Sequence, residues 1–174
     1  MSRISRSSQG QEALVAAQLR NGRKTSRSGA GDLKGDVGVH HSIRDSWMVE
    51  CKDTDDLNIN FQMRHWERVT HDAALEAKTP FLNLRAPMTR VYVCTLATFS
   101  DLINKDVLNR IKVCKRKLES RTHSIPIGYW RHFVFTARDQ KRFPIYCLAT
   151  KNGTLVICDE KEFVEITGDK YATT

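Results

Sequence analysis

Gly35-Asp36-Val37-Gly38-Val39 and Trp47-Met48-Val49-Glu50-Cys51-Lys52 are the two stretches that decide the fold, and the polar turn His41–Ser46 lies between them. Short β-branched runs bounded by polar residues predict two strands of one hairpin. Glu50 and Lys52 are two residues apart, so their side chains leave the same face of the strand while Cys51 points to the opposite, buried face. In such a hairpin, Asp36 can lie across from Glu50.

The rest of the chain predicts an α/β fold in which a mixed central β-sheet is flanked by helices. Residues 1–100 are expected to form the core, and residues 101–174 a basic helix followed by a small β-rich C-terminal extension. Asn152-Gly153 between apolar runs predicts a hairpin turn, and no internal repeat is apparent. Helices are expected at residues 9–19, 61–78 and 104–119, strands at 81–84, 90–96, 129–135, 145–149 and 155–158, and a basic Gly/Ser loop at 23–35.

Charge is the first indication of a partner. The chain carries a formal net charge of +8, and residues 1–34 and 104–123 each hold seven Lys and Arg against two Asp and Glu. Two basic segments around a more acidic middle favour a polyanion partner. The alternatives are a solvated basic surface or a basic membrane-surface helix, although the apolar faces here are typical of core faces.

Location is constrained by what the sequence lacks. No stretch approaches the roughly 20 apolar residues needed to cross a bilayer, and residues 1–11 lack the apolar core of a secretory signal. The five cysteines are scattered without CxxC or zinc-ligand spacing. These features predict an intracellular protein, cytoplasmic or nucleoid-associated, with reduced thiols and no membrane partner.

Two carboxylates and a lysine on one sheet face have the chemistry for phosphodiester hydrolysis. Asp36 and Glu50 can hold Mg²⁺, a hard ion that prefers oxygen ligands. Lys52 can position or activate the attacking water, or stabilise charge that develops on the phosphate. The alternative is an ordinary surface ion pair between Glu50 and Lys52. Asp32, in the neighbouring loop, is a rival to Asp36.

Asp36, Glu50 and Lys52 resemble the D…E-x-K signature of the PD-(D/E)xK nuclease superfamily, with Gly35 where the family often has proline. The order of elements over residues 8–98 is similar to the archaeal and viral Holliday junction resolvase branch. That resemblance implies a restriction-endonuclease-like fold and a homodimer that cuts branched DNA with Mg²⁺, for which Mn²⁺ can substitute. It also implies that Glu12 helps to bind the metal. Residues 104–174 have no counterpart in the family.

We therefore expect a structure-selective DNA endonuclease that acts in recombination or repair. The alternatives are another nuclease of the superfamily, of restriction, flap or exonuclease type, and a non-catalytic nucleic-acid-binding protein. A viral source is compatible with so compact a nuclease. The expected catalytic residues are Asp36, Glu50, Lys52 and Glu12; the expected metal ligands are Asp36, Glu50 and Glu12; and the expected DNA-binding residues are Arg23, Lys24, Arg27, Ser28, Lys34, Lys112, Lys115 and Arg116.

Overall fold

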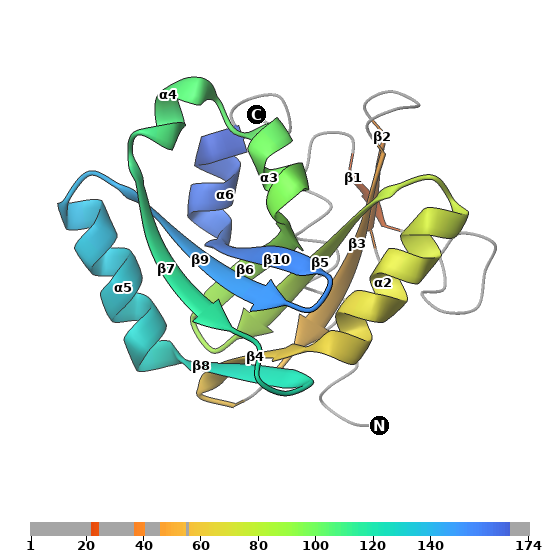
Figure 1. Cartoon of the computed structure of the whole chain (residues 1–174), viewed down its shortest axis with the longest axis horizontal. Coiled ribbons are helices and arrows are strands. Elements are labelled where there is room, and N and C mark those ends of the chain that lie inside the picture. Colours follow the sequence, from red (N-terminus) through yellow and green to blue (C-terminus); the bar gives the residue numbers. More distant parts are fainter. Residues whose placement is uncertain (1–21, 25–36, 41–45, 55, 168–174) are drawn as a thin grey trace.

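A computed structural model describes residues 22–24, 37–40, 46–54 and 56–167. Its centre is a mixed sheet in the order β1-β2-β3-β5-β6-β10-β9-β7, and a separate two-stranded sheet pairs β4 with β8 (Figure 1). The strands are β1 (Gly22–Lys24), β2 (Val37–His40), β3 (Ser46–Asp53), β4 (Asn58–Gln62), β5 (Thr79–Ala86), β6 (Thr89–Thr95), β7 (Ile111–Lys117), β8 (Thr122–Pro126), β9 (Phe143–Thr150) and β10 (Gly153–Asp159). The helices are α2 (Met63–Leu75), α3 (Leu96–Leu102), α4 (Lys105–Leu108), α5 (Ile127–Asp139) and α6 (Glu160–Thr167).

The central sheet has an apolar core on each face. Alternate residues of its strands point to opposite sides, because the side-chain period of a strand is two. Met48 and Leu84 pack on one side with Trp66 of α2 and Trp130 of α5. The opposite side packs against α3 and α6, and Phe163 lies at its centre. The fold is therefore α/β with helices on both faces of a mixed sheet, as the sequence predicts.

The predicted hairpin around the turn at 41–46 is confirmed. β2 and β3 pair antiparallel with Val37 opposite Val49, and β3 pairs in parallel with β5. The helix expected at 61–78 is present as α2, which ends at Leu75, and Ala77 with a φ of 52° turns the chain toward β5. The Asn152-Gly153 hairpin is also confirmed, and Gly153 adopts a φ of +126°.

Two element predictions in the C-terminal half are wrong. The helix expected at 104–119 is instead the short α4 followed by strand β7. Ile111 and Cys114 have helical spacing, but they pack on opposite faces of an edge strand. The strand expected at 129–135 is helix α5, in which the spacing of the buried Trp130, Phe133, Val134 and Ala137 outweighs the β-propensity of its aromatic residues.

The structure also corrects the view that the chain has no internal repeat. Residues 46–103 fold as β3-β4-α2-β5-β6-α3, and residues 110–167 fold as β7-β8-α5-β9-β10-α6. Every element of the second repeat begins or pairs 64 residues after its counterpart: Trp47 pairs with Thr79 in the first, and Ile111 with Phe143 in the second. The two repeats therefore have the same topology and the same strand register.

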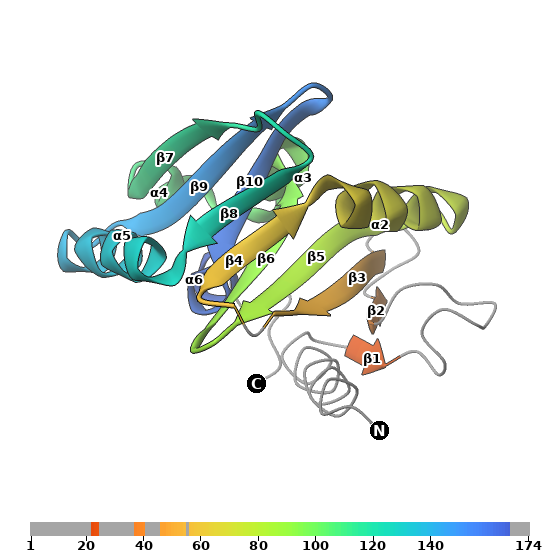
Figure 2. The ribbon, with the colours of Figure 1, turned by 90° about the horizontal axis from the view of Figure 1, so that it is seen from below.

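A pseudo-two-fold axis relates the repeats. The β4–β8 ribbon is reciprocal, since Asn58 opposite Pro126 becomes Thr122 opposite Gln62 when the repeats are exchanged. Its ends are also reciprocal: Met63 N donates to Arg121 O at 2.8 Å, and Ile127 N donates to Leu57 O at 3.1 Å. Such mutual contacts are what a two-fold operation produces. Figure 2 shows α2 and α5 on either side of this ribbon.

The central sheet continues from one repeat into the other. β6 and β10 pair antiparallel, and Val93 opposite Ile157 lies at the centre of the ladder. Strands from residues 101–174 therefore complete the sheet that begins in residues 1–100. The division of the chain at residue 100 stays a prediction.

Candidate functional site

Glu50 and Lys52 lie together on β3 beneath α2. The Glu50 residue is 4% exposed, and Lys52 Nζ is 2.5 Å from Glu50 Oε1. Their shared face follows from their spacing of two on a strand. Met48, two residues earlier on the same face, lies in the core, so Glu50 is the point at which this face changes from apolar to charged.

Helix α2 adds a second cation to the Glu50 carboxylate. Arg68 Nη1 is 3.9 Å from Glu50 Oε1, and Arg68 Nε is 3.9 Å from Asp72 Oδ2 one turn later. The Arg68 side chain is 56% exposed, whereas that of Glu50 is 6% exposed. The pair at this edge of the sheet is thus a buried carboxylate between one half-buried lysine and one exposed arginine, which is more than an ordinary surface pair.

His65 is a site residue that the sequence analysis did not identify. Burial lowers the pKa of His65 below its usual 6.5, and the nearby positive charges of Lys52 and Arg64 lower it further. Its Nδ1 is buried and has no hydrogen-bond partner among the described residues. A largely neutral imidazole therefore lies beside the Glu50–Lys52 pair at pH 7. Only the packing of α2 on β3 reveals it.

A small cavity opens beside this pair. Its volume is about 160 Å³, and Lys52, His65, Asp53 and Arg85 contribute to its lining. Asp53 Oδ2 and Arg85 Nη1 are 3.6 Å apart at the ends of the parallel strands β3 and β5. The cavity is therefore lined by the Lys52 ammonium group, by the His65 imidazole and by a second carboxylate, Asp53, which forms an ion pair with Arg85.

Several predicted site residues lie outside the described residues: Glu12, Arg27, Ser28, Lys34 and Asp36. Arg23 and Lys24 lie on β1, where they pair with Gly38 and Val37 of β2. Val37 of β2 lies opposite Val49, the residue before Glu50. Among the described residues, no group of three His, Cys, Asp or Glu side chains could hold a metal ion. Glu50 is a suitable hard oxygen ligand, so further ligands would have to come from elsewhere.

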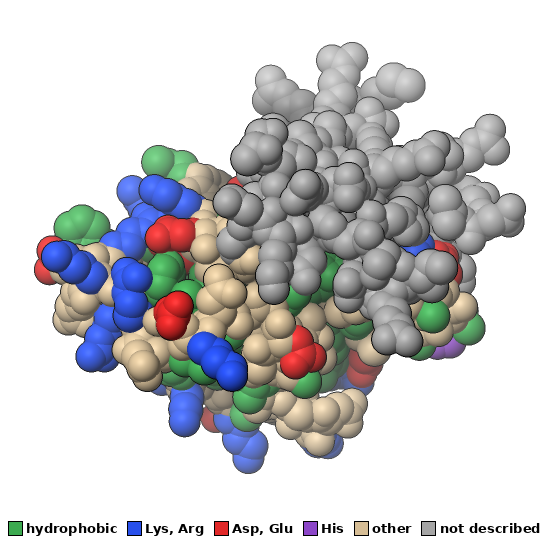
Figure 3. All heavy atoms as spheres, turned by 90° about the horizontal axis from the view of Figure 1, so that it is seen from above, with side chains coloured by type: hydrophobic (Ala, Val, Ile, Leu, Met, Phe, Trp, Pro, Cys, Tyr) green, Lys and Arg blue, Asp and Glu red, His purple; other side chains and the backbone are tan. Residues whose placement is uncertain are grey.

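The basic residues Lys112, Lys115 and Arg116 are not on a helix face. They lie on β7, the strand at one end of the central sheet, and Lys115 and Arg116 are exposed. Lys112 Nζ donates to Gln140 Oε1 at 3.0 Å. Lys and Arg side chains gather on the side of the molecule that carries β7 and α5, as Figure 3 shows. The strand divides the expected basic stripe, because alternate residues of β7 place Lys112 and Arg116 on one face of the sheet and Lys115 on the other.

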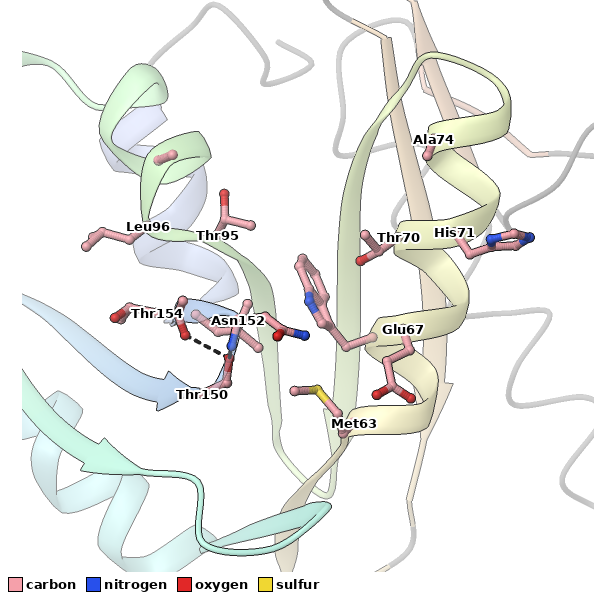
Figure 4. A pocket seen from close by; sticks show the side chains of 14 residues that line it. Met63, Glu67, Thr70, His71, Ala74, Thr95, Leu96, Thr150, Asn152 and Thr154 are labelled. Atoms are coloured by element: carbon pink, nitrogen blue, oxygen red, sulfur yellow. Dashed lines mark hydrogen bonds between the residues drawn. The ribbon is translucent and has the colours of Figure 1, made fainter.

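A larger groove lies apart from the Glu50–Lys52 pair. Its volume is about 680 Å³, and it lies between α2 and the β9–β10 turn. Figure 4 shows Glu67 and Thr70 of α2 on one side, with Thr95 and Asn152 on the other. A groove of about 500 Å³ between α5 and the β5–β6 turn occupies the two-fold-related position. The two hollows are therefore products of the repeat architecture, one for each repeat.

No model of a protein family matches the chain, and a search among characterised proteins finds no match. Among the described residues, no helix is both long and apolar enough to cross a membrane.

Proposed function

We propose that the chain is a Mg²⁺-dependent DNA endonuclease of the PD-(D/E)xK type, with branched DNA as its leading substrate. The observation that supports this most is the buried Glu50 carboxylate paired with Lys52 on β3, next to the strand that follows Asp36 directly. The Glu50 residue is 4% exposed, and a bound cation would stabilise such a carboxylate because burying a charge is unfavourable unless it is compensated.

The role of each residue follows from its chemistry. Glu50 would hold the metal through its carboxylate oxygens, with Asp36 and Glu12 as the other ligands. Mg²⁺, once bound, supplies Lewis-acid activation of the scissile phosphate. Lys52 donates hydrogen bonds to the attacking water or to a phosphate oxygen, and its positive charge opposes the negative charge that develops there. His65 lines the same cavity as Lys52, and its imidazole, largely neutral at pH 7, would accept a proton from water in that cavity.

The DNA would be held by its backbone. Exposed Lys115 and Arg116 on β7 supply positive charge at one end of the sheet, and the proposal places Arg27 and Lys34 in the loop that contacts the strand near the cut. Lys and Arg bind phosphates without reading base sequence. A structure-selective enzyme needs this kind of contact. A homodimer, an intracellular location and a role in recombination or repair belong to the same proposal.

The test is a cleavage assay with purified full-length protein, Mg²⁺ and labelled four-way junction, duplex, flap and single-stranded DNA. Glu50→Gln and Lys52→Met are expected to abolish cutting, while Glu67→Gln, which removes an exposed acid of α2 paired with Arg121, is expected to cut as wild type does. Paired symmetric nicks on the junction support the resolvase assignment, and cutting of another substrate supports a different nuclease of the type. Binding without cutting in Mg²⁺ or Mn²⁺ overturns the enzyme and leaves a DNA-binding protein.

A measurement of metal affinity separates the two roles in the site. Lys52 Nζ forms an ion pair with Glu50 Oε1, so a bound metal ion would compete with the lysine for that oxygen. Titration with Mn²⁺ should show equal or tighter binding to Lys52→Met than to wild type, and weaker binding to Glu50→Gln. Loss of metal binding in Lys52→Met alone would show that Glu50 is only a structural partner of the lysine.

A further inference from the structure

The pseudo-two-fold axis gives the candidate site a counterpart in the second repeat. Glu50 is matched by Cys114, Lys52 by Arg116 and His65 by Tyr129, each 64 residues later. The corresponding strands, β3 and β7, both pair in parallel with their neighbours, and the corresponding helices α2 and α5 pack on the same face of the sheet. The two positions therefore have the same backbone and different side chains.

The matched side chains in the second repeat form a cluster of their own. Cys114 Sγ is 3.3 Å from Tyr129 Oη, and Arg116 Nη2 donates to the same hydroxyl at 3.5 Å. Arg116 Nη1 donates to Lys115 O at 3.0 Å, so the guanidinium is held over the strand. Arg116 and Tyr129 are both exposed, and Tyr129 is 42% exposed. The cluster therefore presents hydrogen-bond donors and positive charge to solvent.

Every acid of the first site is replaced in the second. Cys114 stands at the position of Glu50, Lys117 at that of Asp53, and Thr136 at that of Asp72. Residues 46–103 contain six Lys and Arg against eight Asp and Glu, a formal charge of −2, while residues 110–167 contain twelve against six, or +6. A position without carboxylates cannot hold a divalent ion as the first would, but a cluster of Arg and Tyr donors suits an anion.

We propose that the Cys114–Arg116–Tyr129 cluster is a second, non-catalytic site that binds a backbone phosphate of the same DNA. The identity of the anion as DNA phosphate rests on the proposed function. Arg116 supplies a guanidinium and Tyr129 a hydroxyl, and Lys112, on the same face of β7, lies two residues from Cys114. The chain would then hold DNA at two positions related by the two-fold axis and cut it at one of them.

A different explanation exists for basic residues on β7. An edge strand that carries lysine and arginine resists pairing with another chain, and among the described residues β7 pairs only with β9. That role requires charge of either sign, whereas phosphate binding requires positive charge. Arg116→Glu distinguishes the two, because it keeps the edge charged and reverses the sign.

The experiment measures binding of a fluorescently labelled four-way junction and of a duplex to full-length protein by anisotropy, in EDTA so that no strand is cut. Arg116→Glu is expected to weaken binding at least about 10-fold, and Arg116→Ala to lower the slope of log affinity against log salt by about one. The matched control is Lys161→Glu, an equal charge change at an exposed position on α6, on the opposite face of the sheet. The Lys161→Glu protein should bind DNA with an affinity close to that of wild type.

The outcomes separate this proposal from the nuclease proposal. Weaker binding by Arg116→Glu with no cutting by wild type in Mg²⁺ keeps the phosphate site and removes the nuclease. Cutting by wild type together with unchanged binding and KM for Arg116→Glu overturns the phosphate site and keeps the nuclease. Equal losses of DNA affinity in Arg116→Glu and Lys161→Glu also overturn the site, since the change in the net charge of the protein would then explain both losses. Each comparison requires soluble Arg116→Glu protein that elutes from gel filtration at the same volume as wild type.

Discussion

Replacing Lys52 with methionine tests whether the buried Glu50 carboxylate depends on this ammonium group. Lys52 Nζ is 2.5 Å from Glu50 Oε1, and among the described residues the other cation in ion-pair contact with that oxygen, Arg68, is 3.9 Å away and 56% exposed. Removing one partner of a buried pair destabilises a fold by about 3–5 kcal/mol. The Lys52 side chain is 33% exposed, so water screens the pair, and we expect a loss of about 1–3 kcal/mol.

The companion variants complete a double-mutant cycle. Glu50→Gln removes the buried charge and leaves Lys52 free to turn to solvent, so we expect a loss below about 1 kcal/mol. The double variant Glu50→Gln/Lys52→Met contains neither charge and should be more stable than Lys52→Met alone. The coupling free energy is therefore expected to be about 1–2 kcal/mol.

Thermal and urea unfolding in metal-free buffer give these values. For a chain of this size, about 1 kcal/mol corresponds to about 2–4 °C in Tm, so Lys52→Met should melt about 3–10 °C below wild type. Glu67→Gln serves as the control, because it removes an exposed ion pair. A Lys52→Met protein as stable as wild type, or singles that simply add in the double variant, would refute the view that Lys52 compensates a buried charge.

Three other predictions concern pH, backbone strain and the site histidine. Burial and the neighbouring Glu162 raise the pKa of Asp159 to about 7 from 3.8, so the stability that its protonation contributes is present below pH 3.8 and lost as pH rises through 7. Asp159→Asn should therefore be more stable than wild type by about 1–3 kcal/mol at pH 8 and equal to it near pH 4, measured by urea unfolding at both pH values. Ala77 and Lys141 follow α2 and α5 with φ of 52° and 55°, and left-handed conformation disfavours side chains, so Ala77→Gly and Lys141→Gly should each raise Tm by about 1–4 °C in a thermal melt. His65→Gln should lower the cleavage rate about 10- to 100-fold at pH 7 and remove the acid limb of the pH–rate profile, whereas a purely structural His65 would leave the profile unchanged.

The geometry around Glu50 could be predicted because it depends on local rules. A spacing of two places Glu50 and Lys52 on the same face of β3. The short separation of β2 and β3 along the chain favours their antiparallel pairing, which the structure shows. His65 could not be predicted in this way. Its place depends on the angle at which α2 packs over β3, and its position on the helix looks like any other polar position in the sequence.

The basic segment at 104–119 shows where local rules fail. Ile111, Cys114 and Leu118 have helical spacing, but parallel pairing with β9 makes residues 111–117 a strand. A parallel strand at the end of a sheet depends on a partner more than 30 residues away along the chain, here Phe143 for Ile111. No window of neighbouring residues contains that information, so the pattern alone favours the wrong period.

The repeat is not visible in the sequence, because its two halves have the same topology and core packing but few identical residues. Only seven of the 58 positions matched between residues 46–103 and 110–167 are identical, too few to distinguish from chance in a sequence of ordinary composition. Other core positions hold apolar side chains of different size; for example, Leu82 is matched by Tyr146. The identical pairs are Val49 and Val113, Trp66 and Trp130, Ala73 and Ala137, Pro80 and Pro144, Leu84 and Leu148, Cys94 and Cys158, and Phe99 and Phe163.

The contrast between shared core and altered site bears on how many strands one chain can cut. Five of the identical pairs are buried in both repeats, among them Trp66 with Trp130 and Phe99 with Phe163, whereas the position of the Glu50 carboxylate holds Cys114 in the second repeat. Under the proposed function, one chain therefore has one cutting centre, and both strands of a junction are cut only when two chains act. In a mixture of wild-type protein with excess Glu50→Gln protein, most dimers that hold a wild-type subunit also hold an inactive one, so a supercoiled plasmid that extrudes a cruciform should be nicked but rarely linearised. Linear product from such mixed dimers, at the same ratio to nicked product as with wild type alone, would contradict a single centre in each chain.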